Sequence, residues 1–321
     1  MNNNHISHYG TESSGFTLIE LMIALVLGLL ISAAVIQVYV ISARTSMVQQ
    51  SASEVQDTTI FALQAIDEHI RLANLGNPVS SIKDTTPHGG IVLSTNNLGN
   101  SNTTEAKYFT ASADSDGWTG SSNINGVESD QLTIQYKNIT TESLYDCEGT
   151  EIVSGSSDWV VERYFIRKAT GGAATDLVLA CAAGRVDEEG VIVTAFTGTG
   201  FTGTGEVIIP AVDQFKVLLG TMTDVSQLSY MPANTYLTLT EKPAITTIKL
   251  GVIVRSNTPL MEDPESVIAA ADKGKFLVLG TEQRLNTSSL GKKHYRRSYE
   301  STIVLRSARV MSVTGLKSNV T

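Results

Sequence analysis

The sequence predicts an α+β protein in which one long N-terminal helix packs against a mostly antiparallel β-sheet. Residues 16–75 read as continuous helix, apolar on all sides at first and then apolar at every third or fourth position. From residue 79 onward Thr, Ser, Gly, Asn, Val and Ile dominate, and short apolar runs recur between turn signals. Helix and strands that are segregated along the chain in this way are typical of an α+β fold.

The composition excludes several classes of protein. Of the 321 residues 42% are hydrophobic and 17% are charged, which is unlike a collagen, a coiled coil or a disordered chain. The net charge of -9 argues against nucleic-acid binding by bulk charge. The sequence contains no HExxH, GxSxG or CxxC motif, so we predict neither enzymatic activity nor a cofactor.

Residues 16–41 predict a membrane-spanning helix. The run FTLIELMIALVLGLLISAAVIQVYVI has one charged residue, Glu20, and exceeds the roughly 20 apolar residues that cross a bilayer. The preceding residues 1–15 are polar, contain no Lys or Arg and end in Gly15. An ordinary secretory signal places its small-residue cleavage site after the apolar part. Cleavage at Gly15 would instead remove residues 1–15 as a leader and retain the apolar helix.

Residues 42–76 are predicted to continue the helix as an amphipathic segment. A small or aliphatic stripe is formed by Val48, Ala52, Val55, Thr59, Ala62, Ile66, Ile70 and Ala73. The opposite face carries Gln49, Glu54, Asp57, Gln64 and Glu68. Gly76 and the following Asn77-Pro78 predict the helix end, because glycine readily forms a left-handed cap and proline cannot continue a helix. We expect His69 on the surface or flank of this helix.

Residues 77–321 are predicted to form a β-rich globular head. Strands are expected at 90–94, 131–136, 159–167, 177–180, 191–195, 207–209, 215–219, 245–255 and 301–305. The alternation is clearest at Leu132, Ile134 and Tyr136, which are separated by polar residues. A short second helix is expected at 263–273.

The chain resembles the class III signal of type IV prepilins at GFTLIE followed by LMIAL, residues 15–25. The resemblance implies that a prepilin peptidase cuts between Gly15 and Phe16 and methylates the new amine of Phe16. It also implies that Glu20 is needed for assembly. A carboxylate in hydrocarbon costs about a few kcal/mol, so Glu20 should have a cationic partner such as the Phe16 ammonium of a neighbouring subunit. The alternative is that Glu20 lies at headgroup depth, where a negative charge suits the start of a helix.

One feature favours a minor pilin or pseudopilin over a major filament subunit. No proline occurs before Pro78, whereas major pilins commonly have a proline that kinks the helix. The leader also departs from most prepilin leaders because it lacks Lys and Arg, so its charge supports a cytoplasmic leader only weakly. Beyond its N-terminus the chain resembles the PilW-like minor pilins. The resembling segments are LMIALVLGLLISAAVIQVYV, FALQAIDEHIRLANLGN, SDQLTIQY, the pair Cys147 and Cys181, IPAVDQFKVLLG, ITTIKLGVIVRS and RRSYESTIVLRSAR.

The resemblance implies a structural role in filament assembly. The protein would be a single-pass protein of the bacterial inner membrane with a periplasmic head, and would later enter the extracellular pilus. Its implied partners are prepilin peptidase, the other minor pilins, the major pilin and the pilus assembly platform, and its implied place is at or near the tip. Two alternatives are a type II secretion pseudopilin of the J type and a tip adhesin or DNA-binding pilin, whose head would meet DNA or a host or abiotic surface.

The two cysteines, Cys147 and Cys181, are too few for a disulfide-rich scaffold and too far apart for a zinc site built from close pairs. In an exported head they are predicted to form a disulfide that stabilises by about 2–4 kcal/mol. The alternative is a pair of buried free thiols.

Two short segments group oxygen ligands as calcium loops do. Their residues are Asp114, Asp116, Asn123, Asn125 and Glu128. The spacing fits no complete EF-hand loop, and the same residue types suit tight turns. Calcium is therefore the weaker of the two interpretations.

A basic cluster precedes the last expected strand. It consists of Lys292, Lys293, Arg296 and Arg297, interleaved with tyrosines. One hypothesis is local contact with DNA, which would be sensitive to salt. The alternative is that these charges flank an apolar strand and limit aggregation.

Overall fold

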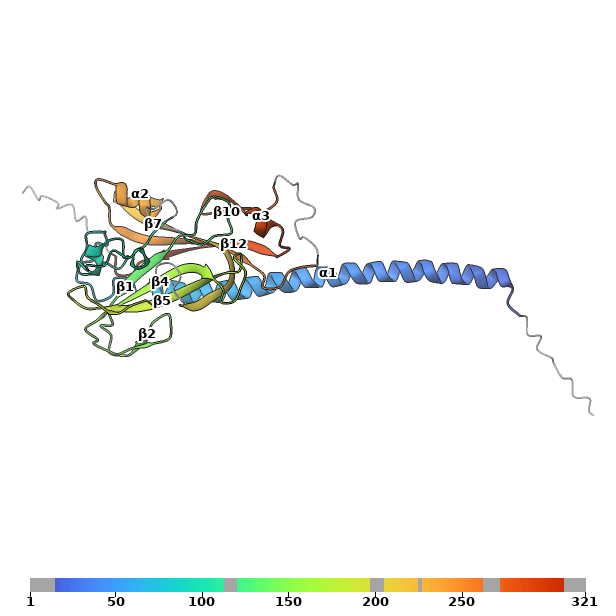
Figure 1. Ribbon diagram of the computed structural model, residues 1–321, viewed down its shortest axis with the longest axis horizontal. Coiled ribbons are helices and arrows are strands. Elements are labelled where there is room, and N and C mark those ends of the chain that lie inside the picture. Colours follow the sequence, from blue (N-terminus) through green and yellow to red (C-terminus); the bar gives the residue numbers. More distant parts are fainter. Residues whose placement is uncertain (1–14, 113–119, 197–204, 225–226, 262–271, 309–321) are drawn as a thin grey trace, which may run out of the picture. The chain divides into compact units, whose positions relative to one another are not determined.

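A computed structural model gives the fold of the chain (Figure 1). It describes residues 15–112, 120–196, 205–224, 227–261 and 272–308. The chain forms two compact units, one ending at Met47 and the other beginning at Val48. The helix α1 (Leu18–Ile70) contributes to both.

In the first unit α1 leaves its apolar side chains exposed. Near the N-terminus it is long and apolar enough to cross a membrane, and none of its most apolar window is buried within the protein. Leu30 and Ile31, in the middle of this part, are 62% and 65% exposed. So much apolar surface is stable only when lipid or other protein covers it. The finding agrees with the membrane-spanning helix predicted at 16–41.

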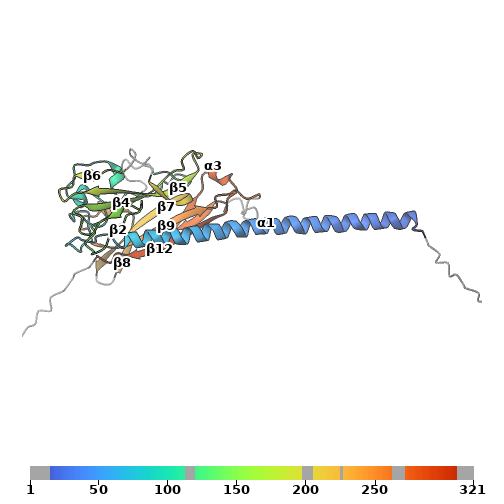
Figure 2. The same cartoon turned by 90° about the horizontal axis from the view of Figure 1, so that it is seen from below.

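In the second unit α1 buries one stripe. Its buried residues are Ser51, Val55, Thr59, Ala62, Ile66 and Ile70. Six of the eight positions in the predicted stripe are buried: the five from Val55 to Ile70, and Ala73, which lies beyond the end of the helix. Figure 2 shows β9 and β12 beside this part of α1. The spacing of three and four therefore predicted correctly which face meets the sheet.

The α-helix ends at Ile70, five residues before the predicted end at Leu75. A turn follows in which Leu72 donates to the carbonyl of His69. Two residues of this turn have a left-handed backbone conformation: Gly76, as predicted, at a φ of +81°, and also Asn74, at a φ of +67°. The Asn74 side chain stabilises this turn, because its Oδ1 accepts from the amide of Gly90 at 3.0 Å. Asparagine enters the left-handed region more readily than most residues because its side chain can bond to nearby backbone; here Nδ2 donates to the carbonyl of Val79 at 2.9 Å.

The main sheet is antiparallel throughout. Its path is β1 (Leu132–Tyr136), β4 (Trp159–Lys168), β5 (Leu177–Val186), β7 (Glu206–Asp224), β9 (Ile245–Arg255) and β12 (Arg296–Val304). Two further strands, β6 (Ile192–Thr194) and β8 (Gln227–Met231), pair with β5 and β7. Small hairpins are formed by β2 (Leu144–Tyr145) with β3 (Glu151–Ile152), and by β10 (Lys275–Val278) with β11 (Thr281–Arg284).

Several expected strands differ from the structure. Residues 90–94 form a single bridge between Ile91 and Ile134 instead of a strand. The segments 207–209 and 215–219 belong to one strand, β7, whose pairing with its neighbours shifts register at Val212. A bulge accommodates an extra residue without ending the strand, so the two expected strands are one. Most of the helix expected at 263–273 lies outside the described residues.

Short elements were missed because they contain too few residues to show a period. They are β2, β3, β8, β10, β11, the helices α2 (Ala233–Thr238) and α3 (Thr287–Leu290), and the 3-10 helices η1 (Thr95–Leu98) and η2 (Ala106–Tyr108).

Both faces of the sheet are covered. On the side of α1, Ile66 and Ile70 pack with Ile134, Tyr164 and Leu250. On the other side, loop residues and the β10–β11 hairpin cover the strands. The buried side chains on that side form two hydrophobic clusters. One includes Val92, Leu98, Tyr108, Phe165 and Phe196, and the other consists of Ile124, Ile253, Val278 and Leu285. This double cover explains why every residue of β1, polar ones included, is buried.

Candidate functional site

The predicted cleavage junction between Gly15 and Phe16 lies just ahead of α1, separated from it by Thr17. Phe16 is 88% exposed, and a side chain built on Gly15 would meet no atom within 4 Å. The peptide bond between Gly15 and Phe16 is therefore open to an enzyme. The leader residues 1–14 lie outside the described part of the chain.

Glu20 forms a capping box with Thr17 at the start of α1. The Glu20 amide donates to Thr17 Oγ1 at 3.3 Å, and the Thr17 amide donates to Glu20 Oε2 at 3.4 Å. This reciprocal pair satisfies two backbone N–H groups that a helix start leaves without partners. A carboxylate here also suits the positive end of the helix dipole. Glu20 thus has a stabilising contact in its own chain, whatever its contacts with a neighbour.

Cys147 and Cys181 form the predicted disulfide, with their Cα atoms 6.1 Å apart. Cys181 lies in β5 and is fully buried, whereas Cys147 follows β2 and is half-buried. The bridge ties the segment around the β2–β3 hairpin to the centre of the main sheet.

A buried carboxylate next to the disulfide joins four parts of the head. Glu162 Oε1 accepts from Tyr136 Oη at 2.8 Å and from the Cys147 amide at 3.0 Å, and lies 3.0 Å from His69 Nδ1. Its Oε2 accepts from Tyr164 Oη at 2.8 Å. The side chain of Glu162 is fully buried. We call these five residues the Glu162 cluster; it connects the last turn of α1, β1, β4 and the disulfide segment.

The charge of Glu162 controls the protonation of its neighbours. Burial lowers the pKa of His69, but the hydrogen bond and charge of Glu162, together with the charges of Asp146 and Glu68, raise it by more, so the net shift is upward. Burial, followed by the charge of Glu162, holds the pKa of Tyr136 and of Tyr164 far above its usual value. Both phenols therefore remain donors, and protonated His69 forms an ion pair with Glu162.

The Glu162 cluster was not predicted from the sequence, which placed His69 on the surface or flank of the helix. His69 does lie on the flank, with a side chain 24% exposed, but it is engaged in an ion pair. One signal was present: Glu162 occupies an inward position of β4, two residues from both Val160 and Tyr164. A charged residue in such a position requires partners.

The Glu162 cluster does not offer a metal site in the oxidised protein. Within the described residues, Cys147, Glu162 and Cys181 form the one group of three or more such side chains with ligand atoms within 4.8 Å of one another. The two sulfurs are bonded to each other, however, and thiolates are the form that binds metal.

The described members of the predicted calcium set do not make an open cluster of oxygens. Asn123 is buried, and its amide donates to Asp213 Oδ1 at 2.7 Å and to the carbonyl of Thr175 at 2.9 Å. Asn125 and Glu128 are exposed. Asp114 and Asp116 lie outside the described residues.

Part of the basic cluster is engaged in ion pairs within the head, and contact with DNA stays a prediction. Arg296 Nε donates to the fully buried Asp213 at 2.8 Å, and its other nitrogens donate to backbone carbonyls, including that of Ser289 at 3.0 Å. Lys292 donates to Asp176 at 3.1 Å. Lys293 and Arg297 are exposed. The Arg296 guanidinium is therefore committed to the fold, because removing it would leave Asp213 without its closest cation.

Comparisons with known proteins support the N-terminal signal. Residues 12–36 match the family described as the prokaryotic N-terminal methylation motif. Among solved structures, the chain is similar to a type IV-like pilin from Thermus thermophilus at 11% identity and a TM-score of 0.34. That similarity covers 79% of this chain and 97% of the other. No curated protein matches the sequence. The motif match confirms the signal predicted at residues 15–25.

Proposed function

We propose that this chain, which carries a prokaryotic N-terminal methylation motif at residues 12–36, is a PilW-like minor pilin of the type IV pilus. The observation that carries the proposal is the position of that motif. It spans an open Gly15–Phe16 junction and the start of a helix whose apolar surface the protein does not cover. In this proposal the protein is structural and has no enzymatic activity.

Processing converts an anchored precursor into an assembly unit. Prepilin peptidase cuts between Gly15 and Phe16 and methylates the Phe16 amine. The segment 16–41 then holds the protein in the inner membrane as a single span, with the head in the periplasm. The exposed apolar side chains of α1 support this step, since hydrocarbon is the solvent in which they are stable.

Assembly transfers the same helix from lipid to protein. Neighbouring subunits cover the apolar surface, and Glu20 neutralises the Phe16 amine of the next subunit. Pairing is needed because either charge alone would be costly in a dry filament core. The Thr17–Glu20 capping box supports this arrangement, because it fixes the carboxylate at the helix start, near the new N-terminus.

The proposed role is initiation of pilus assembly with the other minor pilins and the major pilin on the assembly platform, followed by a place at or near the tip. The absence of a proline in α1 and the resemblance of the head segments to PilW-like pilins support a minor rather than a major subunit.

The Glu20 mechanism is tested by comparing Glu20→Ala with Glu20→Gln. Glutamine keeps the capping box but removes the charge, whereas alanine removes both. We expect both variants to lose the leader and gain the methyl group by mass spectrometry, and both to be missing from sheared filaments. Normal incorporation of Glu20→Gln would show that the capping contact, not the charge pair, is what assembly needs.

The system in which the protein acts is tested in a strain that lacks the gene. Surface filaments, secreted enzymes, DNA binding and adhesion to a surface are measured in parallel, with the wild-type gene restored as the control. We expect filaments to be lost while secretion continues. Intact filaments with blocked secretion would identify a type II pseudopilin instead, and intact filaments with lost DNA or surface binding would favour the adhesin alternative.

A further inference from the structure

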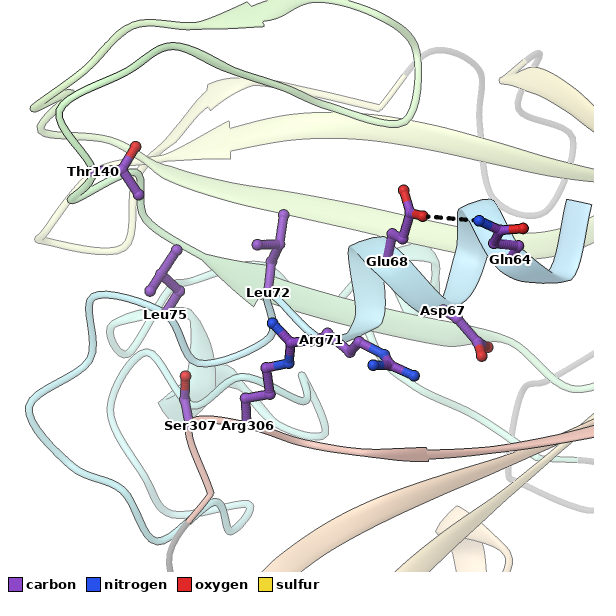
Figure 3. A pocket seen from close by; sticks show the side chains of 9 residues that line it. All are labelled: Gln64, Asp67, Glu68, Arg71, Leu72, Leu75, Thr140, Arg306 and Ser307. Carbon is purple, nitrogen blue, oxygen red and sulfur yellow. Dashed lines mark hydrogen bonds between the residues drawn. The ribbon is translucent and has the colours of Figure 1, made fainter. Parts of the chain in front are cut away.

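A groove of about 610 Å³ opens in the second unit between the end of α1 and the residues after β12. Figure 3 shows its layout: Leu72 and Leu75 lie at one end, Asp67 and Glu68 lie at the other, and Arg71 and Arg306 lie between them. The volume falls within the range of about 300–1,000 Å³ that is common for ligand sites. The groove is thus large enough for a few residues of a peptide.

The two acidic side chains in the groove already have partners. Asp67 accepts from Ser301 Oγ at 3.0 and 3.1 Å, through its two carboxylate oxygens. Glu68 accepts from Gln64 Nε2 at 3.3 Å, as Figure 3 also shows. These contacts hold the acidic end of the groove in place.

The two arginines have no such partners. Neither the Arg71 nor the Arg306 guanidinium forms a hydrogen bond or an ion pair within the described part of the chain, and both side chains are exposed. Elsewhere in the head Arg255 and Arg296 contact carboxylates and carbonyls. Two guanidiniums without a hydrogen-bond or ion-pair partner in the described residues therefore lie beside the two leucines of the groove.

The walls of the groove are fixed before any ligand arrives. Ser301 on β12 is bonded to Asp67 on α1, and Asn74 Nδ2 donates to the carbonyl of Ser307 at 3.4 Å. These bonds join the helix end to the segment that carries Arg306. A preformed site loses less conformational entropy on binding than one that must be ordered.

We propose that this groove binds a segment of a partner protein that presents one carboxylate between apolar side chains. The carboxylate pairs with Arg71 and Arg306, whose guanidinium groups can each donate two parallel hydrogen bonds to it. The apolar neighbours pack on Leu72 and Leu75. Neither contact needs N-terminal processing, so the inference does not depend on the proposed function.

The charge pattern selects this partner over a polyanion. Asp67 and Glu68 border the arginines and would repel a phosphate chain that runs along the groove. The net charge of -9 opposes nucleic acid as well. A single carboxylate with apolar neighbours meets the cationic centre and the leucine end without reaching the acidic end.

The test uses the full-length chain in detergent and a blocked pentapeptide, GLELG, with GLQLG as its uncharged match. Binding is measured by titrating peptide into fluorescently labelled protein. We expect GLELG to bind with a Kd below about 1 mM, and both Arg71→Gln and Arg306→Gln to weaken it at least about tenfold. The matched control is Arg284→Gln, an exposed arginine on β11 outside the groove, which should leave the Kd unchanged.

Three results would overturn the proposal. The first is no measurable binding of GLELG, and the second is equal binding of GLQLG. The third concerns a chain ending at Ala308: if it binds GLELG at least tenfold more tightly than the full chain does, the protein's own C-terminal residues occupy the groove. Because both arginines are exposed, their glutamine variants should fold, and retention of the Cys147–Cys181 disulfide checks that they do.

Discussion

Replacing Glu162 by glutamine tests whether the Glu162 cluster fastens the end of α1 to the sheet. The substitution changes the volume of the side chain very little, but it removes the charge. Three groups meet at Oε1: Tyr136 Oη, the Cys147 amide and His69 Nδ1. A glutamine oxygen placed there keeps these contacts as neutral hydrogen bonds.

The magnitude follows from the number of contacts at Oε1. A hydrogen bond to a charged group contributes about 1.5–3 kcal/mol, and a neutral one about 0.5–1.5 kcal/mol. Each of the three contacts should therefore weaken by about 1–1.5 kcal/mol. The total predicted loss is about 3–4.5 kcal/mol, a large fraction of the stability of an ordinary domain.

The assay monitors the urea unfolding of the full chain in detergent by tryptophan fluorescence. The free energies of unfolding of Glu162→Gln and Glu68→Gln are compared with that of the wild-type protein. Trp159 reports on this region, because it is buried in β4 three residues from Glu162. Glu68 is exposed and contacts only Gln64 by a side-chain hydrogen bond in the described residues, so its variant should lose less than about 0.5 kcal/mol. If Glu162→Gln loses no more than Glu68→Gln, the cluster does not hold the helix and the reasoning is wrong.

Three further predictions follow from the same structure. The pKa of His69 is raised on folding, so its contribution to stability should be complete below the unfolded pKa of about 6.5 and should be lost as the pH rises through the folded pKa. His69→Gln should remove this part of the pH dependence of the urea midpoint. An unchanged pH profile in His69→Gln would show that His69 does not contribute to that dependence. Replacing both Cys147 and Cys181 by serine opens a bridge with a sequence separation of 34, which should cost about 3.8 kcal/mol by chain entropy; reduction of the wild-type protein should cost a similar amount, and a smaller loss in both would refute that estimate. In Gly90→Ala the new Cβ would lie 2.3 Å from the backbone nitrogen of Asn74, so the turn after α1 should shift and the free energy of unfolding should fall by about 3 kcal/mol. In the control Gly291→Ala the new Cβ meets its nearest neighbour at 3.8 Å, so this variant should have the urea midpoint of the wild-type protein.

Much of the fold could be read from local patterns. The spacing of three and four from Val55 to Ile70 predicted the buried face of α1, and the alternation in 131–136 predicted β1. Such patterns arise because a helix or strand presents one face to the core, so the signal is contained in neighbouring residues. The N-terminal signal is equally local, since a peptidase and a membrane both act on a short continuous segment.

The tertiary structure alone decided where the polar residues find their partners. Glu162 is paired with His69, which lies 93 residues away in the chain, and Arg296 with Asp213, which lies 83 residues away. No local pattern encodes such a pairing. For this reason the basic cluster was interpreted from the sequence as an accessible surface. In the structure Arg296 pairs with a buried carboxylate, whereas Arg71 and Arg306 are exposed in the groove. The sequence by itself determined the long helix, its exposed apolar part and most strands of the main sheet. The packing of strands distant in sequence determined which charges are neutralised inside the head and which remain exposed to a partner, because a buried charge requires an opposite charge that only the fold can bring to it.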